Sequence, residues 1–395
     1  MMNRVLPPLW LLIGIVGLPQ LSETVYTPAL PDIAESLSVA ESLVELTLTL
    51  FLAGFALGTL IWGRISDSTG RKPCLIAGML VYIAGCAGCW ASTTITALLI
   101  SRFIQAFGCS TGSVLGQAMC RDVFHGKALG VAFSVIAGAL AFSPAVGPII
   151  GGVVVQFFGW PTIFIVLMLL GLLLIGISSI WLPETHHRDD RSAVHLGPLI
   201  RRLIRDRHVL GCGILVAAAN GIQFSYYAEG SFYLISLLGL SPVVYGMSFI
   251  GIACATIAGS FLSKQLHRSY TSHDILGIGI WIIFGGAAVF AGAITLCTTI
   301  AVYQQSRIAI TLASMMLIMV GIGTMIPNAL SLALEEYGAA KGTAASFFGF
   351  FYYTLIAEAT AGMSFLHNGT LYPMPLYFLL LSISMIFAKK LVRST

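Results

Sequence analysis

The stretch LFLAGFALGTLIWGRISDSTGRKP, residues 50 to 73, joins an apolar segment to a short charged loop. A helix needs about 20 apolar residues to cross the hydrocarbon core of a membrane, and this segment supplies most of one crossing. The loop then gathers Asp67, Arg71 and Lys72, although only 9% of the chain is charged. Because Gly63 and Gly70 allow a tight turn, the stretch predicts two membrane helices joined by a charged turn.

The same alternation continues along the whole chain of 395 residues, which is 57% hydrophobic with a mean hydropathy of +0.92. A water-soluble domain would not carry this composition. Roughly twelve apolar runs reach spanning length, at residues 9–30, 42–63, 74–92, 97–119, 128–156, 161–182, 209–229, 243–264, 274–296, 306–327, 343–366 and 371–389. We therefore predict an all-α membrane protein with twelve transmembrane helices, the hairpin at 296–306 being the least clear. Glu23 and two prolines in the first run favour a spanning helix over a cleaved signal peptide.

The positive charges indicate how the chain is oriented. If the N-terminus is cytoplasmic, every Lys and Arg except Arg102 and Arg307 lies at a cytoplasmic helix end or in a cytoplasmic loop. The positive-inside rule demands this distribution, so we expect both termini in the cytoplasm. The net charge of +4 then reflects topology, and no nucleic-acid partner is expected. The eight cysteines lie in or beside apolar runs and are expected to be small buried hydrophobes.

One long polar break divides the chain into an N-terminal six-helix bundle at 1–182, a cytoplasmic linker at 183–208 and a C-terminal six-helix bundle at 209–395. The second half echoes the first: SFIGIACATIAGSFLSKQL at 248–266 follows the pattern of the second run. Two pseudosymmetric bundles of this kind place a transport site at their interface near the membrane midplane. The linker segment LIRRLIRDRH is either a short amphipathic helix on the inner leaflet or a solvated tether.

Four motifs resemble those of a known family, the Major Facilitator Superfamily. The charged turn resembles that family's loop between its second and third helices, and SRFIQAFG at 101–108 is similar to its fourth-helix motif. GALAFSPAVGPIIGG at 138–152 resembles the fifth-helix motif of its antiporter branches. YTPALPDI at 26–33 and LPET at 182–185 resemble its Bcr/CflA drug-resistance group. The resemblance covers the whole chain and implies two six-helix bundles that move against each other.

The resemblance also implies roles for two sets of residues. The charged turn would belong to a gating network that holds the outward-facing state, made of Gly63, Asp67, Gly70, Arg71, Lys72, Arg121 and Asp122; turn geometry and membrane orientation alone are the alternative. The fifth-helix motif would seal a leak path, through Gly138, Pro144, Gly147, Pro148, Gly151 and Gly152. Physically, these small residues permit close helix packing, which is also sufficient to explain them.

One position departs from the group's pattern. Where the group usually has an acid, four residues before the first-helix proline, this chain has Thr24, and Glu23 lies one place earlier. One residue is about 100° around a helix. Whether Glu23 takes over that role therefore depends on how the neighbouring prolines distort the backbone.

Ionisable residues inside a membrane are costly, so each is a candidate for function. The candidates for proton coupling or substrate binding are Glu23, Arg102, Gln105, Asn220, Gln223, Tyr227, Arg307, Phe351 and Glu358. Glu23 and then Glu358 are the favoured proton or cation sites, with Arg102 tuning proton release. The fourth run carries a polar stripe from Arg102 through Gln105 and Cys109 to Ser113 and Gln117, which is expected to line a water-filled cavity. Glu45 is expected to be exposed at the outer end of its run, and Glu229 is either intramembrane or an outer helix end.

Aromatic faces beside a buried carboxylate suit an amphipathic cation, although they are equally typical of helix packing. The leading hypothesis is a proton-coupled multidrug exporter in a bacterial inner membrane, working by alternating access. The alternative is an importer of an anionic solute, such as a metal-siderophore or a carboxylate, bound by the pseudosymmetric pair Arg102 and Arg307. No enzymatic activity, metal or cofactor is expected, since a catalytic cluster and a Walker motif are both missing from the sequence. The expected partners are protons, a small-molecule substrate and the lipid bilayer, with the protein as a monomer.

Overall fold

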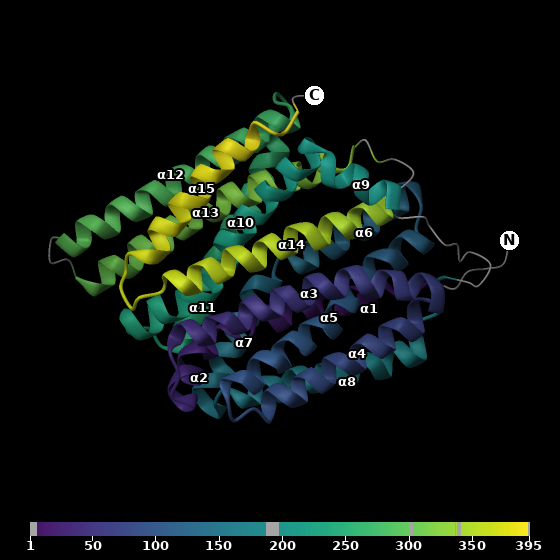
Figure 1. Cartoon of the computed structure of the whole chain (residues 1–395), viewed down its shortest axis with the longest axis horizontal. Helices are drawn as coiled ribbons and strands as arrows, with labels where there is room; N and C mark the ends of the chain where they lie inside the picture. Colours follow the sequence, from purple (N-terminus) through teal and green to yellow (C-terminus); the bar gives the residue numbers. More distant parts are fainter. Residues whose placement is uncertain (1–5, 187–196, 300–302, 336, 338–340, 394–395) are drawn as a thin grey trace.

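A computed structural model describes residues 6–186, 197–299, 303–335, 337 and 341–393. Throughout these ranges the regular structure is helical, and no strand occurs in them (Figure 1). The N-terminal part contains α1 (Leu9–Thr24), the short 3-10 helix η1 (Thr27–Ala29), α2 (Leu30–Leu37), α3 (Glu41–Thr69), α4 (Arg71–Trp90), α5 (Ile95–Val123), α6 (Gly126–Leu140), α7 (Ser143–Phe158) and α8 (Pro161–Trp181). The C-terminal part contains α9 (Gly197–Arg205), α10 (Arg207–Ser231), the π-helical segment η3 (Phe232–Leu237), α11 (Pro242–Leu266), α12 (Ser272–Thr299), α13 (Gln304–Ala333), α14 (Lys341–Leu366) and α15 (Pro373–Lys389).

The all-helical membrane fold predicted from the sequence is confirmed. Ten stretches of the described chain are long and apolar enough to cross a membrane. The two remaining predicted runs correspond to α14 and to α15, which has 17 residues. The least clear predicted hairpin falls partly on residues 300–302, and the linker partly on residues 187–196, both outside the described residues.

Three predicted runs differ from simple helices. The first consists of α1, η1 and α2 in succession, so the chain bends just after Glu23 and Thr24. The fifth is divided into α6 and α7, because Pro144 lacks a backbone N–H and its ring favours the start of a new helix. The seventh extends beyond α10 into η3. Each irregularity lies in an element that meets the other half of the molecule.

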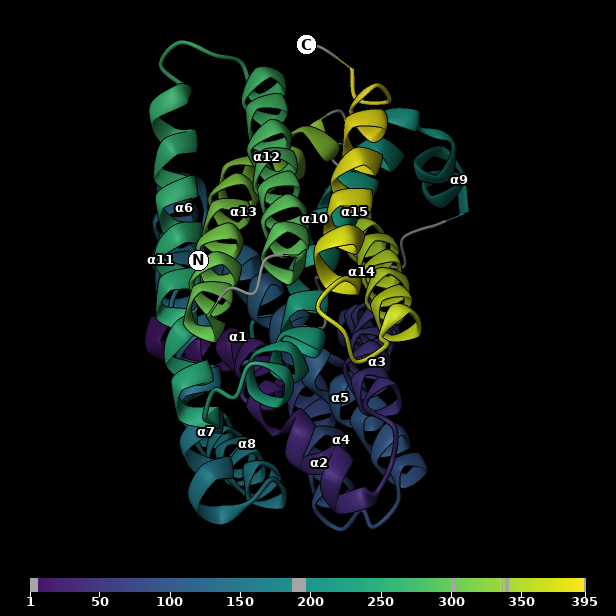
Figure 2. The same ribbon diagram turned by 90° about the vertical axis from the view of Figure 1, so that its left-hand side faces the viewer.

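The helices form two groups, α1–α8 and α10–α15, which lie side by side (Figure 2). One hydrophobic core gathers residues between Leu11 and Leu182, together with Phe232. A second core gathers residues between Leu203 and Val392, joined by residues of α3. We call these groups the N-terminal and C-terminal halves. They meet where α3 packs against α14 and where α7 packs against α11.

The two ends of the bundle differ. The basic end holds the start of α1, the end of α15 and the turn between α3 and α4; the opposite end holds α2 and the end of α14 (Figure 1). Near the opposite end, η1 and α2 add contacts with α10, α11 and η3. The α6 segment, nearer the basic end, instead packs against α1 and α5 of its own half. The halves are therefore joined more closely at the opposite end.

Candidate functional site

Glu23 lies in the last turn of α1, and its neighbour Thr24 explains which way it faces. Thr24 is buried, and its hydroxyl occupies the space that a Cβ atom on Gly147 of α7 would need. Glu23 lies about 100° further round the helix and is half-buried. Its charge acts on Arg102 and on the hydroxyls of Tyr227 in α10 and Tyr353 in α14. Position 24 thus serves helix packing, whereas the charge of Glu23 reaches Arg102 in its own half and two tyrosines of the other half.

Arg102 of α5 is completely buried. Its guanidinium carbon lies 4.2 Å from the ring centre of Tyr26 and 4.3 Å from that of Phe51. Nη1 donates a 2.6 Å hydrogen bond to Gln105 Oε1, while Nε and Nη2 have no hydrogen-bond partner among the described residues. A buried cation of this kind requires a compensating charge, and Glu23 is the acid on which it acts.

The polar stripe on α5 is only partly open. Arg102, Gln105 and Cys109 are all fully buried, so the prediction that they line an open cavity is wrong. They are enclosed because α1 and α4 cover this face of α5. Only the part of the stripe toward the basic end is accessible, where Ser113 is half-buried and Gln117 is exposed.

The candidates on α10 form a short polar and aromatic ladder. Asn220 Nδ2 donates to the Val216 carbonyl at 2.9 Å, and Gln223 Nε2 donates to the Tyr227 hydroxyl at 2.5 Å. Tyr227 is buried, and its ring centre lies 5.4 Å from that of Phe249 in α11. Because Glu23 acts on Tyr227, this ladder is joined to α1 of the other half.

The remaining predicted residues lie apart from this centre. Phe351 of α14 is half-buried against Gly213 of α10, so it takes part in helix packing. Glu358 is exposed, and the aromatic wall therefore does not end in an enclosed acid. Arg307 of α13 donates from Nη2 to the Cys297 carbonyl at 3.2 Å. Arg102 and Arg307 each make their contacts within their own half.

The charged turn between α3 and α4 centres on Arg71. Its Nη1 lies 2.6 Å from Asp67 Oδ1, and its Nε lies 3.0 Å from Asp122 Oδ2 at the end of α5. Arg121 is exposed and acts on this group only through longer-range charge. Lys72 Nζ donates to the Ser179 carbonyl of α8 at 2.8 Å. All of these contacts lie within the N-terminal half.

Glu184, which follows α8, completes the same group. Its carboxylate accepts hydrogen bonds from the backbone N–H groups of Arg71, at 2.8 Å, and Lys72, at 3.2 Å. These are first-turn N–H groups of α4, which have no partner inside their own helix. Sequence reasoning did not assign this cap, although Glu184 belongs to the LPET stretch that resembles a family motif.

The glycines of the fifth-helix motif mark two different contacts. A Cβ atom on Gly147 or Gly151 would meet Thr24 or the Val25 carbonyl, both on α1 or just after it. A Cβ atom on Gly152 would instead meet the Pro242 carbonyl at the start of α11, in the other half. Gly138, by contrast, has open space around it. Pro148 faces α11 as well, since a Cβ on Gly246 would meet its carbonyl oxygen.

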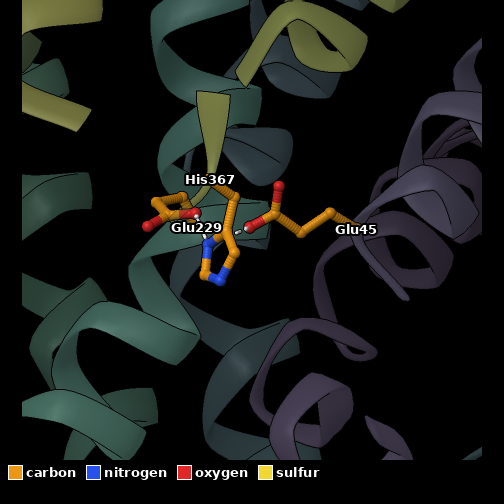
Figure 3. A group of neighbouring side chains, drawn as sticks. All are labelled: Glu45, Glu229 and His367. Carbon is orange, nitrogen blue, oxygen red and sulfur yellow. Dashed lines mark hydrogen bonds and ion pairs between the residues drawn. The ribbon is translucent and has the colours of Figure 1, made fainter. Parts of the chain in front are cut away.

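A cluster that the sequence did not predict lies between the halves near the opposite end (Figure 3). Glu45 and Glu229 are both fully buried, so the expectation that Glu45 is exposed is wrong. Glu45 lies near the start of the second predicted run, and it is buried because α10 and α14 pack against α3. His367, directly after α14, points at both carboxyl groups. One sequence signal could have pointed to this cluster. Glu41 and Glu45 are spaced i, i+4, which places both acids on one face of a helix.

Two parallel groups of membrane helices, with small-residue contacts and a charged residue at their interface, define a secondary-transporter architecture. The family model of the Major Facilitator Superfamily matches residues 12–360, and the chain belongs to this superfamily. An uncharacterized transporter of Rickettsia bellii is 35% identical, over 95% of this chain and 94% of its own length. A bicyclomycin resistance protein homolog of Haemophilus influenzae is 30% identical, over 86% and 84% respectively. In fold, the chain resembles a D-xylose-proton symporter with a TM-score of 0.76, at 14% identity and 98% coverage of both chains.

Proposed function

We propose that this protein is a proton-coupled exporter of small amphipathic cations, acting in multidrug efflux across a bacterial inner membrane. The observation that carries the proposal is the position of Glu23, a half-buried carboxyl group on α1 that lies close enough to Tyr227 and Tyr353 of the other half for its charge to act on them. Aromatic rings beside a carboxylate attract an organic cation through dispersion, cation–π contact and charge. The resistance-protein names of several relatives support the same class of substrate.

The coupling follows from competition for one carboxyl group. A proton and a cationic substrate both neutralise Glu23, and a site that takes only one of them at a time exchanges them across the membrane. Arg102 lies close enough for its charge to act on Glu23, and in this proposal it tunes proton release. In this proposal the basic end faces the cytoplasm, and the domains are 1–182, the linker 183–208, and 209–395.

The test is flux in proteoliposomes with an imposed pH gradient and a fluorescent lipophilic cationic dye. The wild-type protein should move the dye against the proton gradient, and Glu23→Gln should abolish this movement. Glu35→Gln is the matched control, because Glu35 is an exposed acid on α2. Equal dye movement in Glu23→Gln and wild type would contradict the assignment of Glu23.

An importer of an anionic solute is the second candidate, favoured by one observation. The buried Nε atoms of Arg102 and Arg307 have no hydrogen-bond partner among the described residues, and guanidinium groups readily bind carboxylates. A ferric polycarboxylate chelate, tested beside the dye, distinguishes the two. Chelate uptake that is lost in Arg307→Ala, without any dye movement, would replace the exporter by the importer.

A further inference from the structure

Four titratable side chains meet between the two halves near the opposite end. Glu41 and Glu45 come from α3 in the N-terminal half; Glu229 of α10 and His367, after α14, come from the C-terminal half (Figure 3). The side chains of Glu45, Glu229 and His367 are exposed by 0%, 1% and 9%. The cluster is thus a largely dry junction between elements that must separate if this end opens.

The histidine ring bridges carboxylates from both halves. Nδ1 lies 2.7 Å from Glu229 Oε2, and Nε2 lies 3.0 Å from Glu41 Oε2. An ionised carboxylate only accepts hydrogen bonds, so a ring that bonds to two of them carries a proton on each nitrogen. Both ring nitrogens of His367 contact carboxyl groups, and the contact with Glu41 crosses from one half to the other.

The two buried acids, Glu45 and Glu229, favour a proton between them. The Glu45 carboxyl faces that of Glu229 and the hydroxyl of Ser364, and it lies 3.5 Å from His367 Nδ1. No donor satisfies either Glu45 oxygen in the described part of the chain. Two carboxyl groups that face each other at fully buried positions are costly to ionise together, which favours a proton held by the pair.

Among the described residues, the surroundings supply no other cation in direct contact with the cluster. The ring of Phe232 covers His367, with the ring centres 5.8 Å apart. Tyr233 is the titratable group that faces Glu229 from η3, and Arg307 acts on Tyr233 rather than pairing with an acid of the cluster. Three carboxyl groups and one imidazole therefore balance their charge mainly with protons.

We propose that Glu41, Glu45, Glu229 and His367 form a proton-binding latch that holds the two halves together at the opposite end only while it is protonated. Loss of its protons leaves a neutral ring and as many as three carboxylates facing one another, and their repulsion separates α3 from α10 and α14. The latch itself requires only that the two halves move relative to each other. The side of the membrane from which it takes its protons rests on the proposed function, which places this end outside the cell.

The latch has a defined place in proton-coupled export. Protons from the acidic outer side load the cluster when the outer end is open, and closure then seals it between the halves. They return to the same side when the end opens again, so the latch adds no transported charge. It sets the pH at which the outer gate closes, while Glu23 exchanges protons for substrate.

The experiment measures the distance across the opposite end by pulsed electron spin resonance, without substrate. Spin labels are attached at Thr93→Cys and Tyr303→Cys in a Cys254→Ser background, in nanodiscs between about pH 5 and pH 9, which brackets the ordinary pKa of histidine. Thr93 lies between α4 and α5, and Tyr303 precedes α13; both are exposed, as is Cys254. The wild-type protein should show a short distance in acid, and a longer component that grows as the pH rises.

Two variants should remove the pH response, and a third should keep the opposite end closed at every pH. Glu229→Gln and His367→Gln should shift the midpoint of opening by ~1 pH unit or more, or abolish the transition. His367→Lys keeps a positive charge and should hold the short distance across the whole range, which shows that the junction still folds. Glu35→Gln, outside the cluster, should behave as wild type.

The latch would be overturned if the midpoint of opening were unchanged in Glu229→Gln and His367→Gln. It would also be overturned if the distance in the wild-type protein did not change with pH. Closure that requires added Zn²⁺ and not acid would overturn it too, because the 2.7 Å gap between Nδ1 and Oε2 would then hold a metal instead of a proton. Dye flux is measured separately in the same variants. Absent flux in every protein contradicts the proposed function, whereas an unchanged distance response contradicts the latch.

Discussion

The charged turn at the basic end and the cluster at the opposite end are both ionic groups enclosed by helices, yet they join different things. Arg71, Asp67 and Asp122 tie α3, α4 and α5 together within one half. Glu45, Glu229 and His367 tie one half to the other. Removing the first group should therefore weaken a half without changing how the halves meet, and removing the second should do the reverse.

Arg71→Ala should give the largest effect. It removes the guanidinium that lies 3.0 Å from Asp122, whose side chain is only 17% exposed. Breaking a buried ion pair by removing one partner costs about 3 kcal/mol, which should appear as a lower melting temperature of the detergent-solubilised protein. The distance between labels at the opposite end should stay as in wild type. Arg64→Ala is the control, since Arg64 is an exposed cation near the end of α3, on the other side of the same turn.

The distinction between the two ionic groups would be wrong if Arg71→Ala changed the label distance at the opposite end. A longer label distance with an unchanged melting temperature would mean that the charged turn controls the contact between the halves in this state. The gating role implied by the sequence resemblance would then apply directly to the conformation described above.

The glycines of α7 sharpen the comparison within a single helix. Gly151→Ala would push a methyl group into the Val25 carbonyl of the same half, and overpacking of this kind costs about 2 kcal/mol. Gly152→Ala would push it into the Pro242 carbonyl of the other half. We expect a lower melting temperature for the first variant and a longer opposite-end distance for the second.

Gly138→Ala provides the matched control for both variants, because nothing lies within 4 Å of a Cβ atom added there. It should match wild type in melting temperature and in label distance. If Gly151→Ala and Gly152→Ala had identical effects, the division between contacts within and between halves would not describe α7.

Hydrophobic run length predicted the helices well, because a membrane span leaves a strong local pattern. The contact between Asp67 and Arg71 was also local, because only four positions separate them across the turn between α3 and α4. Glu45 was misjudged because its place near the end of a run indicates its depth in the membrane, whereas its burial depends on α10 and α14. His367 joins residues more than a hundred positions away, and such a meeting has no local pattern.

The direction of Glu23 was the other open point, and it was settled by packing. Sequence spacing placed Glu23 and Thr24 about 100° apart, without showing which of them faces the centre. The close approach of Gly147 to Thr24 fixes the rotation of α1, and Glu23 turns toward Arg102 as a result. A pairwise contact between two helices, absent from either segment alone, thus decides which of the two side chains lies toward Arg102.

Glu184→Ala should give the smallest effect of the series. The carboxylate caps the first turn of α4 through the N–H groups of Arg71 and Lys72, and loss of a cap costs about 1 kcal/mol. Glu184→Gln keeps one acceptor oxygen and should lose less, because only the favourable charge at the helix N-terminus is removed. Both values come from melting temperatures, read beside the opposite-end distance. Because the cap and its helix belong to one half, that distance should not change; a change would show that strain at the basic end is carried through α3 and α4 to the latch, and that the two ends are one coupled system.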